Sequence, residues 1–301
     1  MHTTIHKLRL LASLACLSLT IMLFSCGGDD DENIHFGPVK LGKYESRIEV
    51  PKMLNSGTQF ITHTTKENGH DVLGYCVEYD LGKRHSRWVA FRFDGETRER
   101  QVNSRANSWR DDPMLDSKYH IGGNAYQGGY ARGHLCASYD RRYSLEAEDA
   151  TYYMTNMSPM YYEFNGNYWT IFEGFIQDKG RNPLSVNDTL YVVKGGTIEN
   201  GQTIGTCRTS NGSTTVVPKH YFIAAVMYRG GNYSGIGFWV EHKNYSASAK
   251  FNKNTELRKC SMNIDELEEL TGIDFFCNIP DDKERKMEKE NIETIRSAWG
   301  L

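Results

Sequence analysis

Residues in the middle of the chain have types and positions suited to one kind of chemistry. Arg132 and His134 flank a glycine, and Asn165 and Glu173 follow downstream. Hydrolysis of a phosphodiester needs a group that activates water, a positive charge that meets the developing negative charge, and a metal ion that holds the leaving oxygen. An arginine, a histidine, a neutral amide and a carboxylate match these needs, so the segment predicts phosphodiester hydrolysis.

The same residues lie in a recognisable pattern. Residues 130–138, Tyr-Ala-Arg-Gly-His-Leu-Cys-Ala-Ser, resemble the signature of the DNA/RNA non-specific endonucleases of the ββα-metal class. That signature is Asp-Arg-Gly-His followed by Asn-x-x-x-Trp-x-x-x-Glu, and Asn165, Trp169 and Glu173 have this spacing. The resemblance continues in order through residues 88–91, 155–159, 191–196, 217–222 and 271–276. It covers nearly the whole chain after about residue 50.

The resemblance implies a role for each residue of the signature. Asn165 is expected to bind Mg²⁺, or another divalent cation such as Mn²⁺, with waters filling most of the shell, because Mg²⁺ usually takes few protein ligands. His134 is expected to take a proton from the attacking water, since an ordinary histidine is largely neutral near about pH 7.5. Glu173 is expected to hold a water of the metal's shell. Arg132 is expected to neutralise the phosphate in the transition state.

Other residues near the signature are expected to assist. Arg105 and Arg141 are predicted to add positive charge at the phosphate, and Asn156 to support the network by hydrogen bonding. Gly133 is predicted to let backbone or substrate approach closely beside the base, because it has no Cβ.

Ala131 departs from the pattern, because the family carries Asp at this position. The missing carboxylate is expected to leave Arg132 and the hairpin of His134 without a brace and to lower activity. Two functions follow. One is a metal-dependent, sugar-non-specific endonuclease of DNA and RNA, and the other is a surface-anchored nucleic-acid-binding protein with a weakly active or inactive nuclease fold. The presence of His134, Asn165 and Glu173 favours the enzyme.

Helix geometry supports a shared site for the downstream residues. At roughly 3.6 residues per turn, Asn165 and Glu173 fall within a quarter turn of each other. They border an apolar stripe made of Trp169, Phe172, Phe175 and Ile176. In an arbitrary helix Asn165 would only cap the first turn and Glu173 would only be solvated. The upstream Arg-Gly-His favours the site.

The N-terminus predicts export. His6, Lys7 and Arg9 precede an apolar run at 10–24, which is shorter than the roughly 20 residues of a membrane-spanning helix, so residues 1–25 are predicted to be a signal peptide. Residues 23–26, Leu-Phe-Ser-Cys, resemble a bacterial lipobox, which predicts acylation of Cys26 and an outer-membrane lipoprotein, with display at the cell surface as a further expectation. An ordinary signal peptide or an uncleaved anchor is the alternative.

A tether and one domain are predicted to follow. Residues 26–48 begin with Gly-Gly-Asp-Asp-Asp-Glu after Cys26 and are predicted to be a flexible acidic linker. This segment resembles that of surface-exported lipoproteins of the Bacteroides group, although a plain solubilising linker fits as well. Residues 49–301 are of a length for one globular domain.

Charge and cysteines narrow the possibilities. The net charge is −3, so binding of a polyanion requires a local basic surface, for which the nearby arginines are Arg105, Arg110, Arg132, Arg141 and Arg142.

The cysteines beyond the signal and lipid site are Cys76, Cys136, Cys207, Cys260 and Cys277. Their odd number leaves at least one thiol unpaired, and a Cys207–Cys260 disulfide is one possibility. The sequence has no C-x-x-C pair, so a structural zinc site is not predicted. The closeness of Cys136 to His134 follows from strand periodicity alone, which disfavours thiol catalysis.

The remaining pattern predicts an α+β fold. Strands are predicted at 72–79, 87–93, 189–193, 220–227 and 235–240, and helices at 264–270, after the cap Asn263, and at 284–298. The sum is a central, mainly antiparallel sheet with flanking helices and a ββα-metal motif.

Overall fold

The computed structural model describes residues 42–103, 108–123, 126–183, 185 and 187–301. The predicted signal peptide, Cys26 and Arg105 therefore lie outside the described residues. Residues Leu41–Leu301 form one compact unit. No helix in the described ranges combines the length and the apolar character needed to cross a membrane.

The domain begins earlier than the sequence predicts. Tyr44 and Ile48 pack against a hydrophobic cluster of the core. The carbonyl oxygens of Glu45 and Arg47 accept hydrogen bonds from Asn278 Nδ2 at 3.0 and 2.9 Å. The predicted tether boundary at residue 48 is therefore wrong, because residues 44–48 are held by side chains from the far end of the chain.

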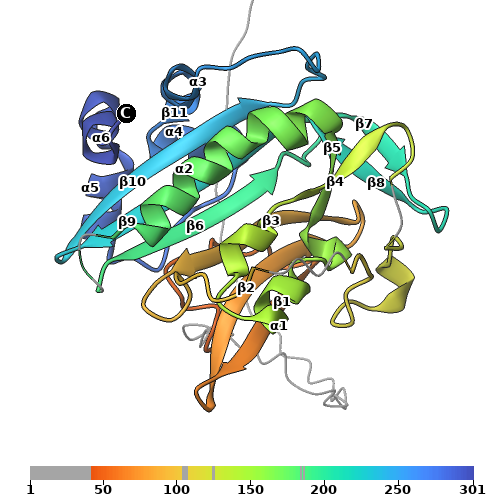
Figure 1. Cartoon of the computed structure of the whole chain (residues 1–301), viewed down its shortest axis with the longest axis horizontal. Coiled ribbons are helices and arrows are strands. Elements are labelled where there is room, and N and C mark those ends of the chain that lie inside the picture. The colour runs from red at the N-terminus through yellow and green to blue at the C-terminus, as the bar shows by residue number, and fades with distance from the viewer. Residues whose placement is uncertain (1–41, 104–107, 124–125, 184, 186) are drawn as a thin grey trace, which may run out of the picture. The chain divides into compact units, whose positions relative to one another are not determined.

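A seven-stranded antiparallel sheet forms the centre of the fold (Figure 1). Its order is β1 (Thr58–Glu67), β2 (His70–Asp80), β3 (His85–Phe93), β6 (Thr189–Gly196), β9 (His220–Arg229), β10 (Asn232–Glu241) and β11 (Ser261–Met262). Each of the five strands predicted from sequence lies inside one of these. β1 has no predicted counterpart, because its threonines and charged residues give little apolar alternation. The predicted α+β class with an antiparallel sheet is confirmed.

Helices cover both faces of this sheet. Tyr75 and Val77 belong to one hydrophobic cluster and Cys76 to the other, as expected when successive strand residues point to opposite faces. The first cluster includes residues of α2 (Trp169–Arg181), α3 (Lys253–Cys260) and α6 (Ile292–Trp299). The second includes residues of α4 (Ile264–Thr271) and α5 (Asp281–Glu288). Figure 1 shows α2 running alongside β6 and β10.

The C-terminal helices follow their caps. Asn263 Oδ1 accepts from the backbone N–H of Glu266 at 2.8 Å, which confirms the predicted start of α4. The helix predicted at 284–298 is instead two helices, α5 and α6. Asn291 interrupts it, because its side chain accepts from the backbone of Glu293 at 2.9 Å and so caps α6. Met287 of α5 and Ile295 of α6 are buried against the core.

Smaller elements complete the unit. β4 (Tyr130–His134) and β5 (Met157–Tyr161) form an antiparallel hairpin, and β7 (Thr203–Arg208) pairs with β8 (Thr214–Pro218). The helix α1 (Leu145–Ala150) is short, and 3₁₀ turns occur at Ser117–Tyr119, Ser138–Arg141 and Met154–Asn156. Hairpin β4–β5 followed by α2 is the predicted ββα unit.

The five cysteines of the domain are all free thiols. Cys207 and Cys260, the pair offered as one possible disulfide, are therefore unbridged. Burial raises the pKa of Cys136, so this thiol is suited to packing and not to nucleophilic attack.

Candidate active site

One open pocket of about 350 Å³ brings together the main residues predicted from the sequence. His134 lines it from the end of β4, Asn165 from the turn before α2, and Glu173 from α2. Its remaining walls are made by Ala137, Ser138, Tyr139, Gly166, Thr170, Gly174 and Gln177. A base, an amide and a carboxylate thus face one solvent-accessible space.

Two aromatic rings hold the imidazole of His134. The ring centroids of His134 and Trp109 lie 5.1 Å apart, and those of His134 and Tyr152 also lie 5.1 Å apart, in an edge-to-face arrangement at 89°. Trp109 and Tyr152 contact each other edge to face at 4.8 Å. The imidazole therefore has a restricted orientation at the wall of the pocket.

Gly133 is required for a different reason from the one predicted. A Cβ at this position would lie 2.3 Å from the sulfur of Met160 on the neighbouring strand. The close neighbour is thus the Met160 side chain, and neither backbone nor substrate takes that space. Gly133 lets the two strands of the catalytic hairpin pack, which fixes the position of His134.

Asn156 hydrogen-bonds to the backbone of the segment that follows His134. It is fully buried, its Oδ1 accepts from the N–H of Cys136 at 2.8 Å, and its Nδ2 donates to the carbonyl oxygens of Cys136 and Thr151 at 2.8 Å. These hydrogen bonds fix the backbone just after His134. Asn156 is a positioning residue that does not line the pocket.

Asn165 lies in a wider turn than the predicted α-helix. The π-helical turn Phe164–Tyr168 precedes α2, and the N–H of Trp169 bonds to the carbonyl of Phe164. A π-helical turn changes the angular spacing of residues, so the projection for a regular helix does not hold across it. Asn165 and Glu173 nevertheless line the same pocket.

Buried charged residues near the pocket shift the pKa of Glu173. Burial raises the pKa of Glu173 to about 7, while Lys194 lowers it and Asp140 raises it. Lys194 Nζ donates to Asp140 Oδ2 at 2.9 Å, and both side chains are fully buried. Asp140 also accepts from Gln177 Nε2 at 2.8 Å. Burial alone would raise the pKa of Asp140, but Lys194, Arg141 and Gln177 together hold that pKa below its usual value.

The residues present fit a divalent cation. Asn165 offers an amide oxygen and Glu173 a carboxylate, which are the hard oxygen donors that Mg²⁺ prefers. A carboxylate whose burial favours its protonated form is stabilised as an anion when a cation binds beside it. In the described part of the chain, no three His, Cys, Asp or Glu side chains cluster as a metal site.

The pKa of Glu173 predicts how metal affinity depends on pH. A proton and a cation compete for this carboxylate, so with a pKa of about 7 the apparent affinity for Mg²⁺ should fall about tenfold between about pH 8 and pH 6. Mn²⁺ binding, followed by electron paramagnetic resonance at several pH values, measures this change. Glu173→Gln should flatten the dependence, and an unchanged slope in that variant would contradict the assignment.

Arg132 has a brace that the sequence does not reveal. Its Nη1 donates to the carbonyl of Gly123 at 2.9 Å, and its guanidinium lies 4.3 Å from the ring centroid of Trp109. Trp109 therefore contacts both Arg132 and His134. The expectation that Ala131 leaves Arg132 unbraced is wrong, since a backbone carbonyl and an indole hold it. Trp109 stands well upstream of the signature and in no motif, so sequence reasoning missed it.

Trp109→Leu should lower nuclease activity while Ala131→Asp changes it little. A cation–π contact contributes about 0.5–2 kcal/mol, so loss of the Arg132 contact should cost roughly twofold to thirtyfold in rate. Cleavage rates under single-turnover conditions measure this effect. Trp239→Leu is the matched control, because Trp239 stacks on His220 instead. Equal rates for Trp109→Leu and Trp239→Leu would refute a positioning role.

Arg141 does not reach the pocket. Its side chain is fully buried, its Nη1 donates to the carbonyls of Gly74 and Arg92 at 3.1 and 2.9 Å, and its guanidinium lies 4.7 Å from the ring centroid of Phe91. The predicted contact with phosphate is wrong for Arg141, because backbone and aromatic rings occupy its guanidinium. Arg105, the other predicted partner, lies outside the described residues.

Other arginines supply positive charge at the pocket. Tyr139 lines the pocket, and the guanidinium carbons of Arg100, Arg142 and Arg181 lie 4.8, 4.9 and 4.9 Å from its ring centroid. We call these three residues the arginine cluster. Arg100 and Arg181 were beyond sequence reasoning because they come from separate segments. The cluster provides the local basic surface that a polyanion requires.

Comparison with known proteins identifies the family of this chain. The family model for DNA/RNA non-specific endonucleases matches residues 56–282. The chain belongs to this family. The nuclease of Nostoc sp. is 30% identical over 213 residues, which cover 68% of this chain and 72% of that protein. Human mitochondrial endonuclease G is 26% identical over 211 residues, which cover 68% of each.

A solved structure shares the fold. A chain in the crystal structure of the EndoG/EndoGI complex superimposes with a TM-score of 0.55 at 17% identity, covering 74% of this chain and 89% of that chain. The pocket residues His134, Asn165 and Glu173 lie within residues 56–282, the range that the family model matches. The protein is a nuclease of this family.

Proposed function

We propose that this endonuclease hydrolyses phosphodiester bonds in both DNA and RNA and requires Mg²⁺ or a similar divalent cation. The main support is the pocket lined by His134, Asn165 and Glu173, with the arginine cluster around Tyr139, which is part of its wall. Arginines bind the phosphate backbone and carry no information about base sequence, which fits a non-specific nuclease.

Each residue of the site has its own role in the proposed hydrolysis. His134 accepts a proton from the attacking water, with its ring oriented by Trp109 and Tyr152. Arg132 neutralises the negative charge that develops on the phosphate. Asn165 would hold the cation, and Glu173 would support it through water. When bound, the cation supplies Lewis acidity that stabilises the leaving oxygen.

A cleavage assay tests the proposal directly. Supercoiled plasmid and a single-stranded RNA are each incubated with the protein in Mg²⁺ or in EDTA. We expect nicking and then degradation of both substrates in Mg²⁺ and no cleavage in EDTA. Retained nucleic-acid binding with no cleavage by the wild type would instead support the binding-protein alternative.

We further propose that the protein is exported and anchored at the outer membrane through a lipid on Cys26. The support is the sequence 23–26 after a charged start and an apolar run. A substrate polymer outside the cell would then meet the enzyme at the membrane surface.

Cys26→Ser should convert a membrane-bound protein into a soluble or unprocessed one, because the acylated thiol is lost. Partition of both forms between detergent and aqueous phases, followed by immunoblotting, measures the change. Equal partition would refute lipidation and leave an ordinary signal peptide or an uncleaved anchor.

A further inference from the structure

Strand β5 has one neighbouring strand, β4, among the described residues. In the register of this pair, Met157 of β5 stands opposite His134, and Ser158 stands opposite Gly133. The place of β5 therefore sets the place of His134. The second edge of β5 needs partners other than a strand, because buried backbone groups without partners destabilise a fold.

His85, the first residue of β3, contacts β5 near its start. Its Nδ1 donates to the carbonyl of Ser86 at 2.7 Å, so in the neutral ring Nε2 accepts from the hydroxyl of Ser158 at 2.6 Å. The hydroxyl of Tyr221 on β9 lies 2.7 Å from Ser158 Oγ and donates to the carbonyl of Pro159 at 3.1 Å. The side chains of His85, Ser158 and Tyr221 are buried. These hydrogen bonds join β5 to β3 and β9.

His242, which directly follows β10, contacts the end of β5. Its Nδ1 donates to the carbonyl of Pro218 at 2.9 Å, and its Nε2 accepts from the backbone N–H of Tyr161 at 2.9 Å. The imidazole thus gives this N–H the acceptor that a neighbouring strand would otherwise supply. The ring also meets Phe164 edge to face, with the ring centroids 4.8 Å apart. Phe164 begins the π-helical turn that carries Asn165, so His242 contacts both the hairpin and that turn.

Both rings must be neutral to accept these hydrogen bonds, because an imidazolium has no free lone pair. Burial lowers the pKa of His85 to about 4, and the charged groups that act on it are Asp80, which raises the pKa, and Lys83, which lowers it. Burial likewise lowers the pKa of His242 to about 4. The rings around His242 are uncharged and belong to Tyr130, Tyr161, Phe164 and Tyr221. The two imidazoles therefore stay neutral below the pH at which an ordinary histidine is protonated.

We propose that His85 and His242 are positioning residues of the nuclease: their neutral rings attach β5 to the ends of β3 and β10, and β5 in turn holds His134 at the pocket. Neither histidine is among the residues that line the pocket, so each acts through the hairpin. The inference rests on the proposed function in one respect, since His134 is taken there as the base.

His85→Leu should lower kcat for plasmid cleavage about ten- to a hundredfold, because a small displacement of the base is costly for the reaction. KM and the affinity for Mn²⁺ should stay near the wild-type values, since Asn165 and Glu173 lie on other elements. Steady-state cleavage and Mn²⁺ titration followed by electron paramagnetic resonance measure these three quantities. His220→Leu is the matched control, because His220 stacks on Trp239 instead.

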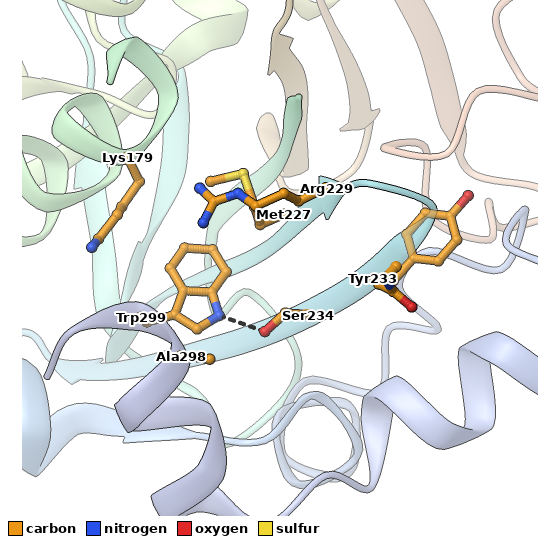
Figure 2. Close-up of a pocket in the computed structure, with 8 residues that line it drawn as sticks. Lys179, Met227, Arg229, Tyr233, Ser234, Ala298 and Trp299 are labelled. Atoms are coloured by element: carbon orange, nitrogen blue, oxygen red, sulfur yellow. Dashed lines mark hydrogen bonds between the residues drawn. The ribbon is translucent and has the colours of Figure 1, made fainter. Parts of the chain in front are cut away.

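Ser158→Ala tests the same hydrogen bond from its other side and is the second variant should His85→Leu fold poorly. It should also lower kcat, and adding it to His85→Leu should cause no further loss, since both remove one hydrogen bond. Ser234→Ala is the matched control, because Ser234 Oγ accepts from Trp299 Nε1 at 3.1 Å at the opposite end of β10 from His242 (Figure 2).

Nuclear magnetic resonance gives a readout that does not depend on cleavage. Long-range ¹H–¹⁵N spectra should show His85 and His242 as neutral Nδ1–H tautomers at about pH 5.5, where an ordinary histidine is mostly protonated. In His242→Leu, hydrogen exchange of the Tyr161 backbone amide should become about tenfold faster than in the wild type, because its acceptor is lost. His220→Leu should leave this exchange rate unchanged.

Three results would overturn the inference. They are an unchanged kcat in folded His85→Leu and Ser158→Ala, rings of His85 and His242 that are protonated in those spectra, and an unchanged exchange rate at Tyr161 in His242→Leu. A wild type that cleaves plasmid while these variants behave as it does refutes only this inference. A wild type with both rings neutral and no cleavage in Mg²⁺ refutes the proposed function instead.

Discussion

His134→Ala is expected to lower the rate of plasmid cleavage by about 10² to 10⁴-fold while leaving the binding of the divalent cation intact. A positioned general base contributes an effect of this size, and alanine cannot accept the proton from water. Single-turnover cleavage at saturating Mg²⁺ measures the rate, and Mn²⁺ titration measures the binding.

Asn165→Ala is the informative partner of this variant. It removes an amide oxygen that faces the same pocket, so it should weaken the binding of the cation. Excess Mg²⁺ should then restore part of the rate. His134→Ala should show no such rescue. Cleavage that needs no metal and survives His134→Ala would defeat the proposed mechanism.

Lys194→Met is expected to destabilise the fold by about 3–5 kcal/mol, the usual cost of removing one partner of a buried ion pair. Asp140 would remain fully buried without the ammonium that now donates to it at 2.9 Å. Urea unfolding followed by circular dichroism at about pH 7 measures the loss. The pKa of Asp140 is lowered in the folded state, so the stability that its ionisation contributes is present at neutral pH and is lost in acid.

A surface ion pair supplies the control for this measurement. Lys253→Met breaks an exposed contact with Asp178 at 3.4 Å, which should cost no more than about 1 kcal/mol. The double variant Lys194→Met with Asp140→Leu should recover much of the loss, because no charge remains buried. A loss in Lys194→Met no larger than in Lys253→Met would show that the buried pair contributes little.

The Lys194 variant also connects stability with catalysis. Lys194 lowers the pKa of Glu173, so its removal should raise that pKa above about 7. The carboxylate would then need a higher pH to ionise and to support a cation. A shift of the pH dependence of metal binding toward alkaline pH is the signature that distinguishes this effect from general loss of folded protein.

The residues to which the proposed chemistry is assigned could be found without the structure. His134, Asn165 and Glu173 stand in a short-range pattern, and hairpin β4–β5 with α2 brings them to one pocket because neighbouring segments supply all three. The antiparallel sheet was equally readable, since its strands are rich in β-branched and aromatic residues. The start of α4 followed from the side chain of Asn263, which acts within a single turn.

The residues that surround the pocket could be found only from the folded structure. Arg141 is directed into the core, while Arg100 and Arg181 converge on Tyr139 from distant segments. Trp109 and the Asp140–Lys194 pair likewise depend on contacts between segments far apart in sequence. Spacing along the chain encodes which residues share one turn, hairpin or helix face. Burial and contacts between elements arise only when the whole core packs, and they set the environment of each charge.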